Sequence, residues 1–205
     1  MTTITMQATR LRTLGLVTVV ASLIGAACAV VIIAWPPQVS DQWYSYPFDS
    51  TGYTVSQSFF AVHHLGMFAG LYGLALVAGL GRASRAIKAG LIIATLGMVA
   101  LTACELFAIT AANSQVGTPT ADAVDNSYGV PMILIGTGLV VAGIGLARRH
   151  VLPGWGRWVT LALGIYVFVP MFPAVFGPMV LGRMAIGVWL LMFAALGVAL
   201  MREES

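Results

Sequence analysis

Charge is what this chain lacks most. Only 8% of its residues are charged, compared with about 25% in ordinary soluble proteins, whereas 59% are hydrophobic and the mean hydropathy is +0.93. Polar stretches longer than about 20 residues are also missing, which leaves no room for a separate soluble domain. The shortage of charge excludes an ordinary globular fold, and we predict a single transmembrane domain over residues 1–205.

Motifs of catalysis and of cofactor binding are missing as well. The sequence contains no nucleophile motif, no phosphate-binding glycine loop and no pair of catalytic carboxylates. Its two cysteines, Cys28 and Cys104, fit no familiar metal spacing, and its three histidines include no pair four residues apart. We therefore predict no zinc, copper or haem cofactor, and the sequence leaves open whether the protein is an enzyme.

Long apolar runs take the place of charge. Each covers about 20 residues, the length that an α-helix needs to cross about 30 Å of hydrocarbon. Leu, Ala, Gly and Val dominate the runs without the alternation of a membrane β-strand, so helices are expected. The sequence predicts an all-α integral membrane protein, a six-transmembrane-helix bundle, with spans at about 14–35, 57–80, 89–112, 129–147, 158–176 and 179–201.

The few charges are placed unevenly between the predicted spans. Nine of the ten basic residues lie at one end of the bundle, and the aspartates lie in the two links at the other end. Because short cytoplasmic loops collect Lys and Arg, we predict cytoplasmic N and C termini in a bacterial inner membrane. No basic run with interleaved aromatic residues is present, so we expect no nucleic-acid partner. The nine basic residues are Arg10, Arg12, Arg82, Arg85, Lys88, Arg148, Arg149, Arg157 and Arg202, and the aspartates are Asp41, Asp49, Asp122 and Asp125.

Glycines recur on two of the predicted spans. Gly66, Gly70 and Gly73 form a stripe on the second span, and a further group lies on the fourth span between positions 136 and 145. In lipid, small residues allow helix backbones to approach closely. These faces are expected to pack against other helices, which belong either to this chain, to a second copy of it, or to another subunit of a membrane complex.

Three ionisable residues interrupt the apolar spans: His63, His64 and Glu105. Counted from the predicted outer ends of the spans, the histidines lie about 10 Å deep and Glu105 about 12 Å deep. An ionisable group at that depth is expensive unless it pairs, exchanges a proton or meets water, so we expect a shared polar layer. Arg183, near the start of the sixth span, and Thr102, on the same helical face as Glu105, are expected to join this layer.

Two further features are expected to border the polar layer. Pro170 and Pro173 interrupt the fifth span, and because proline removes a backbone donor we predict a disrupted helix there. The aromatic link at 36–57, which includes Tyr44 and Tyr46, covers the same end of the bundle. This link is either an interfacial aromatic belt or a lid over a ligand.

The polar layer leads to one main functional prediction and two competing ones. We predict an outward-facing site that binds a small or lipidic ligand or supports a proton-linked step. In the first competing interpretation, the protein is an accessory or assembly subunit whose polar layer only joins helices. In the second, His63, His64 and Glu105 act as acid–base catalysts on a lipid or isoprenoid. The ligand-binding candidates are His63, His64, Glu105, Arg183, Thr102, Tyr44 and Tyr46.

Overall fold

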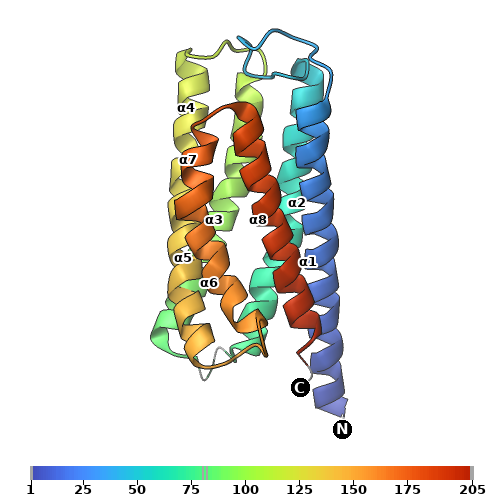
Figure 1. Ribbon diagram of the computed structural model, residues 1–205, viewed down its shortest axis with the longest axis vertical. Helices are drawn as coiled ribbons and strands as arrows, with labels where there is room; N and C mark the ends of the chain where they lie inside the picture. The colour runs from blue at the N-terminus through green and yellow to red at the C-terminus, as the bar shows by residue number, and fades with distance from the viewer. Residues whose placement is uncertain (1, 80, 82, 204–205) are drawn as a thin grey trace.

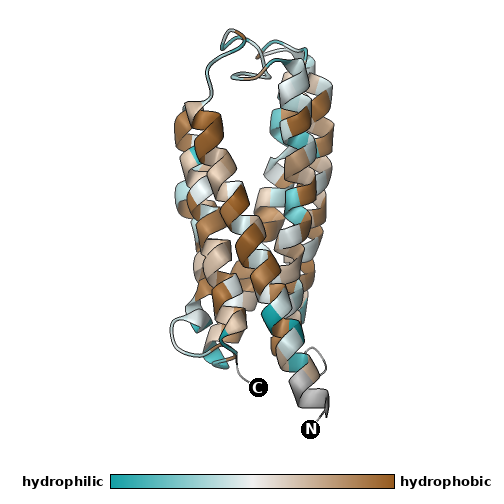
Figure 2. Cartoon of the chain, turned by 90° about the vertical axis from the view of Figure 1, so that its right-hand side faces the viewer, coloured by the Kyte–Doolittle hydropathy of each residue, from teal (hydrophilic) through white to brown (hydrophobic). Residues whose placement is uncertain are grey.

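Six long helical segments make up the structure. The computed structural model describes residues 2–79, 81 and 83–203, and six segments within them are long and apolar enough to cross a membrane. The segments run side by side along one axis (Figure 1), and apolar residues dominate most of their length (Figure 2). No β-strand occurs among the described residues, where Trp43 and Gln115 make only an isolated bridge. For the described residues, the predicted all-helical architecture with six helical segments long and apolar enough to cross a membrane is confirmed.

The spanning segments are built from the following elements. The first three are α1 (Thr2–Ala34), α2 (Ser50–Val77), and α3 (Arg85–Ala108) with the 3-10 turn η1 (Ile109–Ala111). The fourth joins α4 (Pro119–Ser127) to α5 (Gly129–Arg148), and the fifth joins α6 (Gly156–Tyr166), the π-helical η2 (Val167–Met171) and α7 (Phe172–Val175). The sixth is α8 (Met179–Met201), with the predicted bounds. Arg82 and the predicted end of the second span at position 80 lie outside the described residues.

Two helices begin before their apolar runs because polar caps start them. The side chain of Asp49 accepts a hydrogen bond from the Gly52 N–H at 2.7 Å, so α2 begins at Ser50 rather than at 57. The hydroxyl of Ser84 likewise accepts from the Ile87 N–H at 3.3 Å, so α3 begins at Arg85 rather than at 89. The earlier start of α2 changes the depth at which every side chain of that helix lies.

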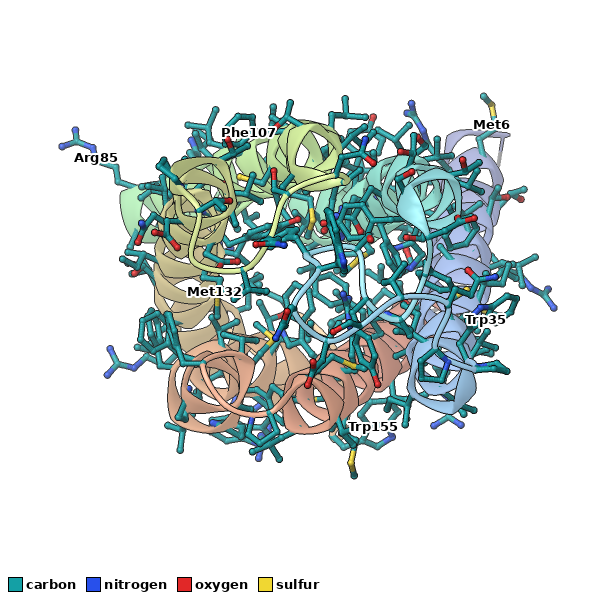
Figure 3. The ribbon with its side chains drawn as sticks, turned by 90° about the horizontal axis from the view of Figure 1, so that it is seen from above. Met6, Trp35, Arg85, Phe107, Met132 and Trp155 are labelled. Carbon is teal, nitrogen blue, oxygen red and sulfur yellow. The ribbon has the colours of Figure 1, made fainter. Side chains whose placement is uncertain are left out.

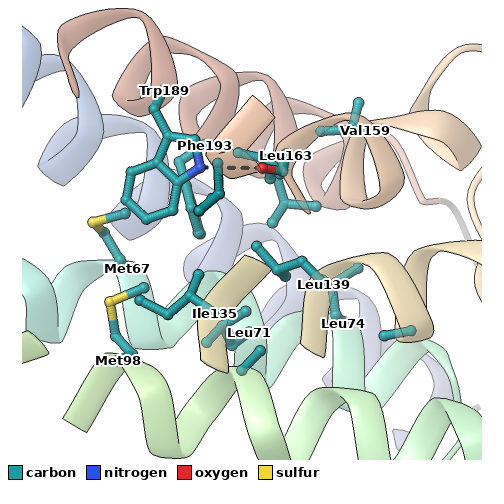
Figure 4. Close-up of a cluster of buried hydrophobic side chains, with 14 of the residues drawn as sticks. Met67, Leu71, Leu74, Met98, Ile135, Leu139, Val159, Leu163, Trp189 and Phe193 are labelled. Atoms are coloured by element: carbon teal, nitrogen blue, oxygen red, sulfur yellow. Dashed lines mark hydrogen bonds between the residues drawn. The ribbon is translucent and has the colours of Figure 1, made fainter. Parts of the chain in front are cut away.

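The six segments form a closed ring around an apolar core. Segments that follow one another in the chain are neighbours in the ring, and α8 closes it by packing along α1. Figure 3 shows this ring along its axis, with Phe107 on the outside. At the centre, Met67, Met98 and Phe193 are completely buried among leucine, isoleucine and valine side chains (Figure 4). Burial of these side chains inside the ring fixes which face of each helix points inward.

The glycine faces pack within this ring. A Cβ atom added to Gly90 would lie 2.7 Å from the carbonyl oxygen of Gly138, and one added to Gly138 would lie 2.6 Å from that of Gly90. Helices α3 and α5 approach this closely because both positions lack a side chain. The predicted stripe on α2 also faces this chain, with Gly66 against α1 and Gly73 against α8. These glycines therefore join helices of one chain.

The fifth segment departs from α-helical geometry at its two prolines, where a disrupted helix was predicted. The π-helical stretch η2 contains Pro170, which has no N–H to donate, and Pro173 lies in the first turn of α7. Just before this stretch, the Leu163 carbonyl accepts a hydrogen bond at 3.3 Å from the indole Nε1 of Trp189 on α8 (Figure 4). A side chain of the neighbouring helix thus ties the irregular segment to the bundle.

The two ends of the bundle differ in charge. Both termini lie at one end (Figure 1), together with the links that carry Arg85, Arg148, Arg149 and Arg157, and we name it the basic end. The opposite end carries the links around Asp41, Asp49, Asp122 and Asp125, and we name it the acidic end. Arg183, close to the start of α8, lies in the acidic-end half.

Candidate functional site

The two links at the acidic end form one cover over the bundle. The Tyr44 N–H donates to the Ser114 carbonyl at 2.9 Å, and the Val116 N–H donates to the Gln42 carbonyl at 2.9 Å. These bonds join the link between α1 and α2 to the link between α3 and α4. Because each link anchors the other, the aromatic segment has a fixed position above the helix ends.

Glu105 lies beneath this cover and is held by two neutral side chains. Its Oε2 accepts a hydrogen bond from the Gln57 amide Nε2 at 2.9 Å and from the Tyr128 hydroxyl at 3.0 Å. The Gln57 amide also lies 3.3 Å from the Tyr128 hydroxyl, so α2, α3 and the start of α5 meet at one point. Only 9% of Glu105 is exposed, and these three residues define the Glu105 cluster.

The two oxygens of the Glu105 carboxyl group differ in their surroundings. Oε2 receives both hydrogen bonds, whereas no hydrogen bond to Oε1 is found in the described part of the chain. A neutral carboxyl group carries its proton on one oxygen and can accept hydrogen bonds at the other. The Glu105 cluster therefore accommodates both the protonated and the ionised forms of Glu105 without breaking a contact.

A second polar contact connects the cover to the helices. The Tyr44 hydroxyl donates to Asp125 Oδ1 at 2.6 Å, which ties the first link to α4. Burial raises the pKa of Tyr44, and the hydrogen bond to Asp125 acts in the same direction, so this phenol remains a neutral donor. Tyr44 also packs edge-on against Tyr53, with ring centroids 6.0 Å apart. Tyr53 lies one turn from Gln57 on the same face of α2 and is buried.

Arg183 reaches this region from α8. Its positive charge acts electrostatically on Glu105, Tyr44 and Tyr53, and its guanidinium carbon lies 5.9 Å from the ring centroid of Phe60. Within the described residues, no ion pair closer than 4.0 Å joins Arg183 to Glu105. Arg183 therefore supplies a positive field near the cluster, while the direct partners of the carboxyl group are uncharged.

The two histidines occupy a different environment deeper in the bundle. His63 and His64 are both buried, and their rings meet edge to face with centroids 5.5 Å apart. His63 fills the space opposite Gly25 on α1, and its ring comes close to the Ala21 carbonyl without hydrogen-bond geometry. Among the described residues, Nδ1 of His64 also has no hydrogen-bond partner, although it is buried. Buried polar atoms usually have partners, so this histidine layer is an exception that calls for a physical reason.

The two histidines and Glu105 lie at different depths, and not in the shared layer that was expected. Gln57, rather than His63 or His64, lies opposite Glu105. His64 is seven residues further along the same face of α2, about 10 Å deeper in the bundle at a rise of about 1.5 Å per residue. The expected depth of the histidines was measured from position 57, where the apolar run starts, whereas α2 begins at Ser50. No hydrogen bond between either histidine and Glu105 is present in the part of the chain that the structure describes.

The remaining predicted residues lie around the cluster or above it. Thr102 is half-buried on α3 and donates its hydroxyl to the Met98 carbonyl at 3.0 Å, within its own helix. Tyr46 is half-buried in the cover. Cys28 and Cys104 are both free thiols, and Cys104 lies 3.4 Å from the Ser127 carbonyl. Of the predicted set, the structure thus gathers Glu105, Arg183 and Tyr44 into one electrostatic region.

The direct partners of Glu105 were not predicted from the sequence. Gln57 and Tyr128 stand at the edges of their apolar runs, where polar residues are common and carry little signal. Gln57 was nevertheless detectable, because it precedes His64 by seven residues and therefore shares its inward face. Tyr128 follows the short helix α4, whose presence the apolar pattern did not indicate. Asp125 was assigned only to topology, although it anchors Tyr44.

The polar contacts of the region join carboxyl, phenol and amide groups. Within residues 2–79, 81 and 83–203, no group of three or more His, Cys, Asp or Glu side chains is placed to hold a metal ion. The expectation that no metal or haem binds stays a prediction. Tyr44 contacts Asp125 and Tyr53 near the cover, the Glu105 cluster lies beneath them, and His64 lies deeper still on α2.

Comparison of the chain with protein-family models, with curated proteins and with solved structures gives no match. Functional conclusions therefore rest on the geometry of the described residues.

Proposed function

We propose that this protein is a multi-pass protein of the bacterial cytoplasmic membrane whose outward half binds and releases a proton at Glu105. The charge difference between the ends supports this orientation, because the basic end would face the cytoplasm under the positive-inside rule. The acidic end, with its cover and the Glu105 cluster, then faces outward. In this arrangement Glu105 carries the proton, and Gln57 and Tyr128 hold the carboxyl group in place.

One observation carries this proposal. The Glu105 carboxyl group is buried, and its described hydrogen-bond partners are both uncharged. An ionisable group at this depth is stabilised by pairing with an opposite charge, by water or by taking up a proton. The described direct partners are an amide and a phenol, and Oε1 has no described hydrogen bond. Proton uptake at Oε1 would satisfy the group, and Arg183 adds a positive charge in the same half of the bundle.

The same geometry favours a proton over a lipid at this level. The side chains of the Glu105 cluster bond to one another, and the cover above them is tied to α4 through Tyr44 and Asp125. The hollow beside Trp155 and Arg202 lies at the basic end. Binding of a small or lipidic ligand is the second candidate use of the site. Entry of such a ligand through the cover would separate the joined links around Tyr44 and Ser114 and break the two backbone bonds between them.

The roles of accessory subunit and of acid–base enzyme gain less support from the geometry. An accessory subunit was expected to bind partner helices through its glycine faces, but Gly66, Gly73, Gly90 and Gly138 pack inside the ring. An acid–base enzyme would need a histidine beside Glu105, and His64 lies about 10 Å deeper. The proton-binding proposal requires neither feature.

Proton uptake by purified protein tests the proposal. The wild type, Glu105→Gln and the control Asp41→Asn would be titrated in detergent, since Asp41 is an exposed carboxyl whose described side-chain contact is with the neighbouring Ser40. We expect the wild type to take up one more proton than Glu105→Gln over the titrated range, because glutamine keeps the shape and loses the titration. Asp41→Asn should keep the proton uptake that depends on Glu105, because it leaves the Glu105 cluster intact.

Superimposable curves for the wild type and Glu105→Gln would contradict the proposal, because Glu105 would then keep one protonation state throughout. A loss of folding by Glu105→Gln alone would be detected by its thermal unfolding. In that event, the same titration on Tyr128→Phe, which keeps the carboxyl group and removes one donor, must show an altered midpoint.

A further inference from the structure

A hollow at the basic end is a second place suited to a ligand. It lies between the beginning of α6 and the end of α8 and has a volume of about 220 Å³. The residues that line it are Pro153, Gly154, Trp155, Gly156, Ala199 and Arg202. Pockets that enclose drug-sized molecules usually measure about 300–1,000 Å³, so this hollow suits part of a molecule, such as a headgroup, rather than all of it.

Small residues create the hollow. Gly154 has a φ of +56°, a conformation that favours glycine and turns the chain into α6. A Cβ atom added to Gly156 would lie 3.0 Å from the Cβ of Ala199, so α6 and α8 are in close contact at the base of the hollow. The floor is therefore closed by backbone and small side chains, while its rim carries the large ones.

The rim combines a cation with an aromatic ring. The guanidinium carbon of Arg202 lies 5.8 Å from the ring centroid of Trp155, within the range of a cation–π contact. Trp155 is 47% exposed, although it is among the largest apolar side chains of the protein. Tryptophan is enriched where a membrane protein meets the headgroup region, with its ring towards the acyl chains. Arg202 and Trp155 together therefore offer both a charge and an apolar surface at the headgroup level.

Among the residues that line the hollow, one is charged, and two glutamates follow it in the sequence. The nearby Arg157 is engaged elsewhere, with its guanidinium 3.0 Å from His150 Nδ1 and 5.0 Å from the ring of Trp158. Arg202 is thus the cation that lines the hollow. Glu203 follows it in the chain but is not one of the lining residues. Arg148 and Arg149 add positive charge at the same end, and such clusters attract anionic lipid.

We propose that this hollow binds the phosphate headgroup of an anionic phospholipid. Arg202 would contact the phosphate, and Trp155 would pack against the adjoining glycerol and acyl segments. The size of the hollow, its apolar floor and its single lining cation all fit a headgroup whose acyl chains continue along the outer surface of α6 and α8. This inference is independent of the proton site, which lies in the other half of the bundle.

Lipid-dependent unfolding tests the inference. Purified protein in a neutral detergent would be titrated with short-chain phosphatidylglycerol or with the matching phosphatidylcholine, and its thermal unfolding midpoint followed. A ligand that binds the folded state raises this midpoint with concentration. We expect phosphatidylglycerol to act at lower concentration than phosphatidylcholine. Arg202→Gln should weaken the apparent affinity for phosphatidylglycerol about fivefold, the factor expected for one basic residue at an anionic surface.

Matched variants separate this hollow from the general charge of the basic end. Arg148→Gln removes one exposed positive charge at the same end but outside the hollow, so it should weaken the affinity less than Arg202→Gln does. Arg202→Lys keeps the charge and should keep the preference for phosphatidylglycerol. Equal effects of the two lipids, or equal weakening by Arg148→Gln and Arg202→Gln, would overturn the inference. An equal rise with inorganic phosphate alone would also overturn it, because the occupant would then be a free anion.

Discussion

The protein contains two buried polar levels that solve the same physical problem differently. At the Glu105 cluster, the amide of Gln57 and the hydroxyl of Tyr128 both donate to one carboxyl oxygen. About 10 Å deeper on the same face of α2, Nδ1 of His64 is buried and has no hydrogen-bond partner in the described part of the chain. The first level has its polar groups matched to one another, whereas the second does not.

The hydrogen bonds of the Glu105 cluster are expected to stabilise the fold, whereas the buried nitrogen of His64 is expected to destabilise it. A buried hydrogen bond contributes modestly to stability, but a buried polar atom without a partner carries its full desolvation cost. Residues that break the rule of satisfied polar groups are commonly found at functional sites. We therefore expect changes at Gln57 and at His64 to shift stability in opposite directions.

The largest effect is expected from Gln57→Leu. This change removes a donor from Glu105 and leaves a buried carboxyl group with Tyr128 as its one described direct partner. Loss of a partner from a buried polar group costs about 1–3 kcal/mol, so the free energy of unfolding should fall by that amount. Chemical unfolding in detergent measures it. Gln42→Leu is the control, since the Gln42 side chain is exposed and should change stability by less than about 0.5 kcal/mol.

A rise in stability for Gln57→Leu would contradict this account, because it would mean that the Glu105 cluster costs more to bury than its hydrogen bonds return. Gln57 and His64 would then both be polar side chains whose removal stabilises the fold.

The second effect is expected from His64→Leu and has the opposite sign. Leucine is similar in volume and removes the buried Nδ1 that has no partner, so the free energy of unfolding should rise by about 1 kcal/mol. The same unfolding measurement detects it. If His64→Leu is instead destabilising by as much as Gln57→Leu, His64 has a stabilising partner and the contrast between the two levels fails.

The smallest effect is expected at the cover, the joined links at the acidic end. Tyr44→Phe removes the 2.6 Å hydrogen bond to Asp125 and keeps the edge-on packing against Tyr53. Asp125 is exposed and can turn to water, so the free energy of unfolding should fall by less than about 1 kcal/mol. Proteolysis of the link around Tyr44 should increase, because one anchor of the cover is lost. An unchanged cleavage rate would show that the backbone bonds alone hold the cover.

The helices were predictable from sequence, but their exact starts were not. Apolar runs identified all six spanning segments, and the predicted sixth has the bounds of α8. The apolar run on α2 starts seven residues after the helix does, because Asp49 caps a polar first turn that hydropathy alone does not register. A seven-residue error in that start placed His63 and His64 at the level that Gln57 occupies.

The inward direction of Glu105 was predictable for a different reason. A carboxyl group inside a spanning helix has few stable positions other than the bundle interior, so its type and depth indicate where it points. Its partners were not predictable, since Gln57 and Tyr128 become neighbours only when α2 and α5 meet α3. The same limit applies to the glycines, whose spacing indicates close packing but not which helix is approached.

The central claim is that Glu105 exchanges a proton while neutral partners hold it, and infrared difference spectroscopy across a pH titration tests it most directly. We predict a band of a protonated, buried carboxyl group that appears as the pH falls, disappears in Glu105→Gln and shifts in frequency in Tyr128→Phe. Asp41→Asn should leave that band unchanged. A spectrum without a Glu105-dependent carboxyl band at any pH, or a band that Tyr128→Phe does not shift, would contradict the account.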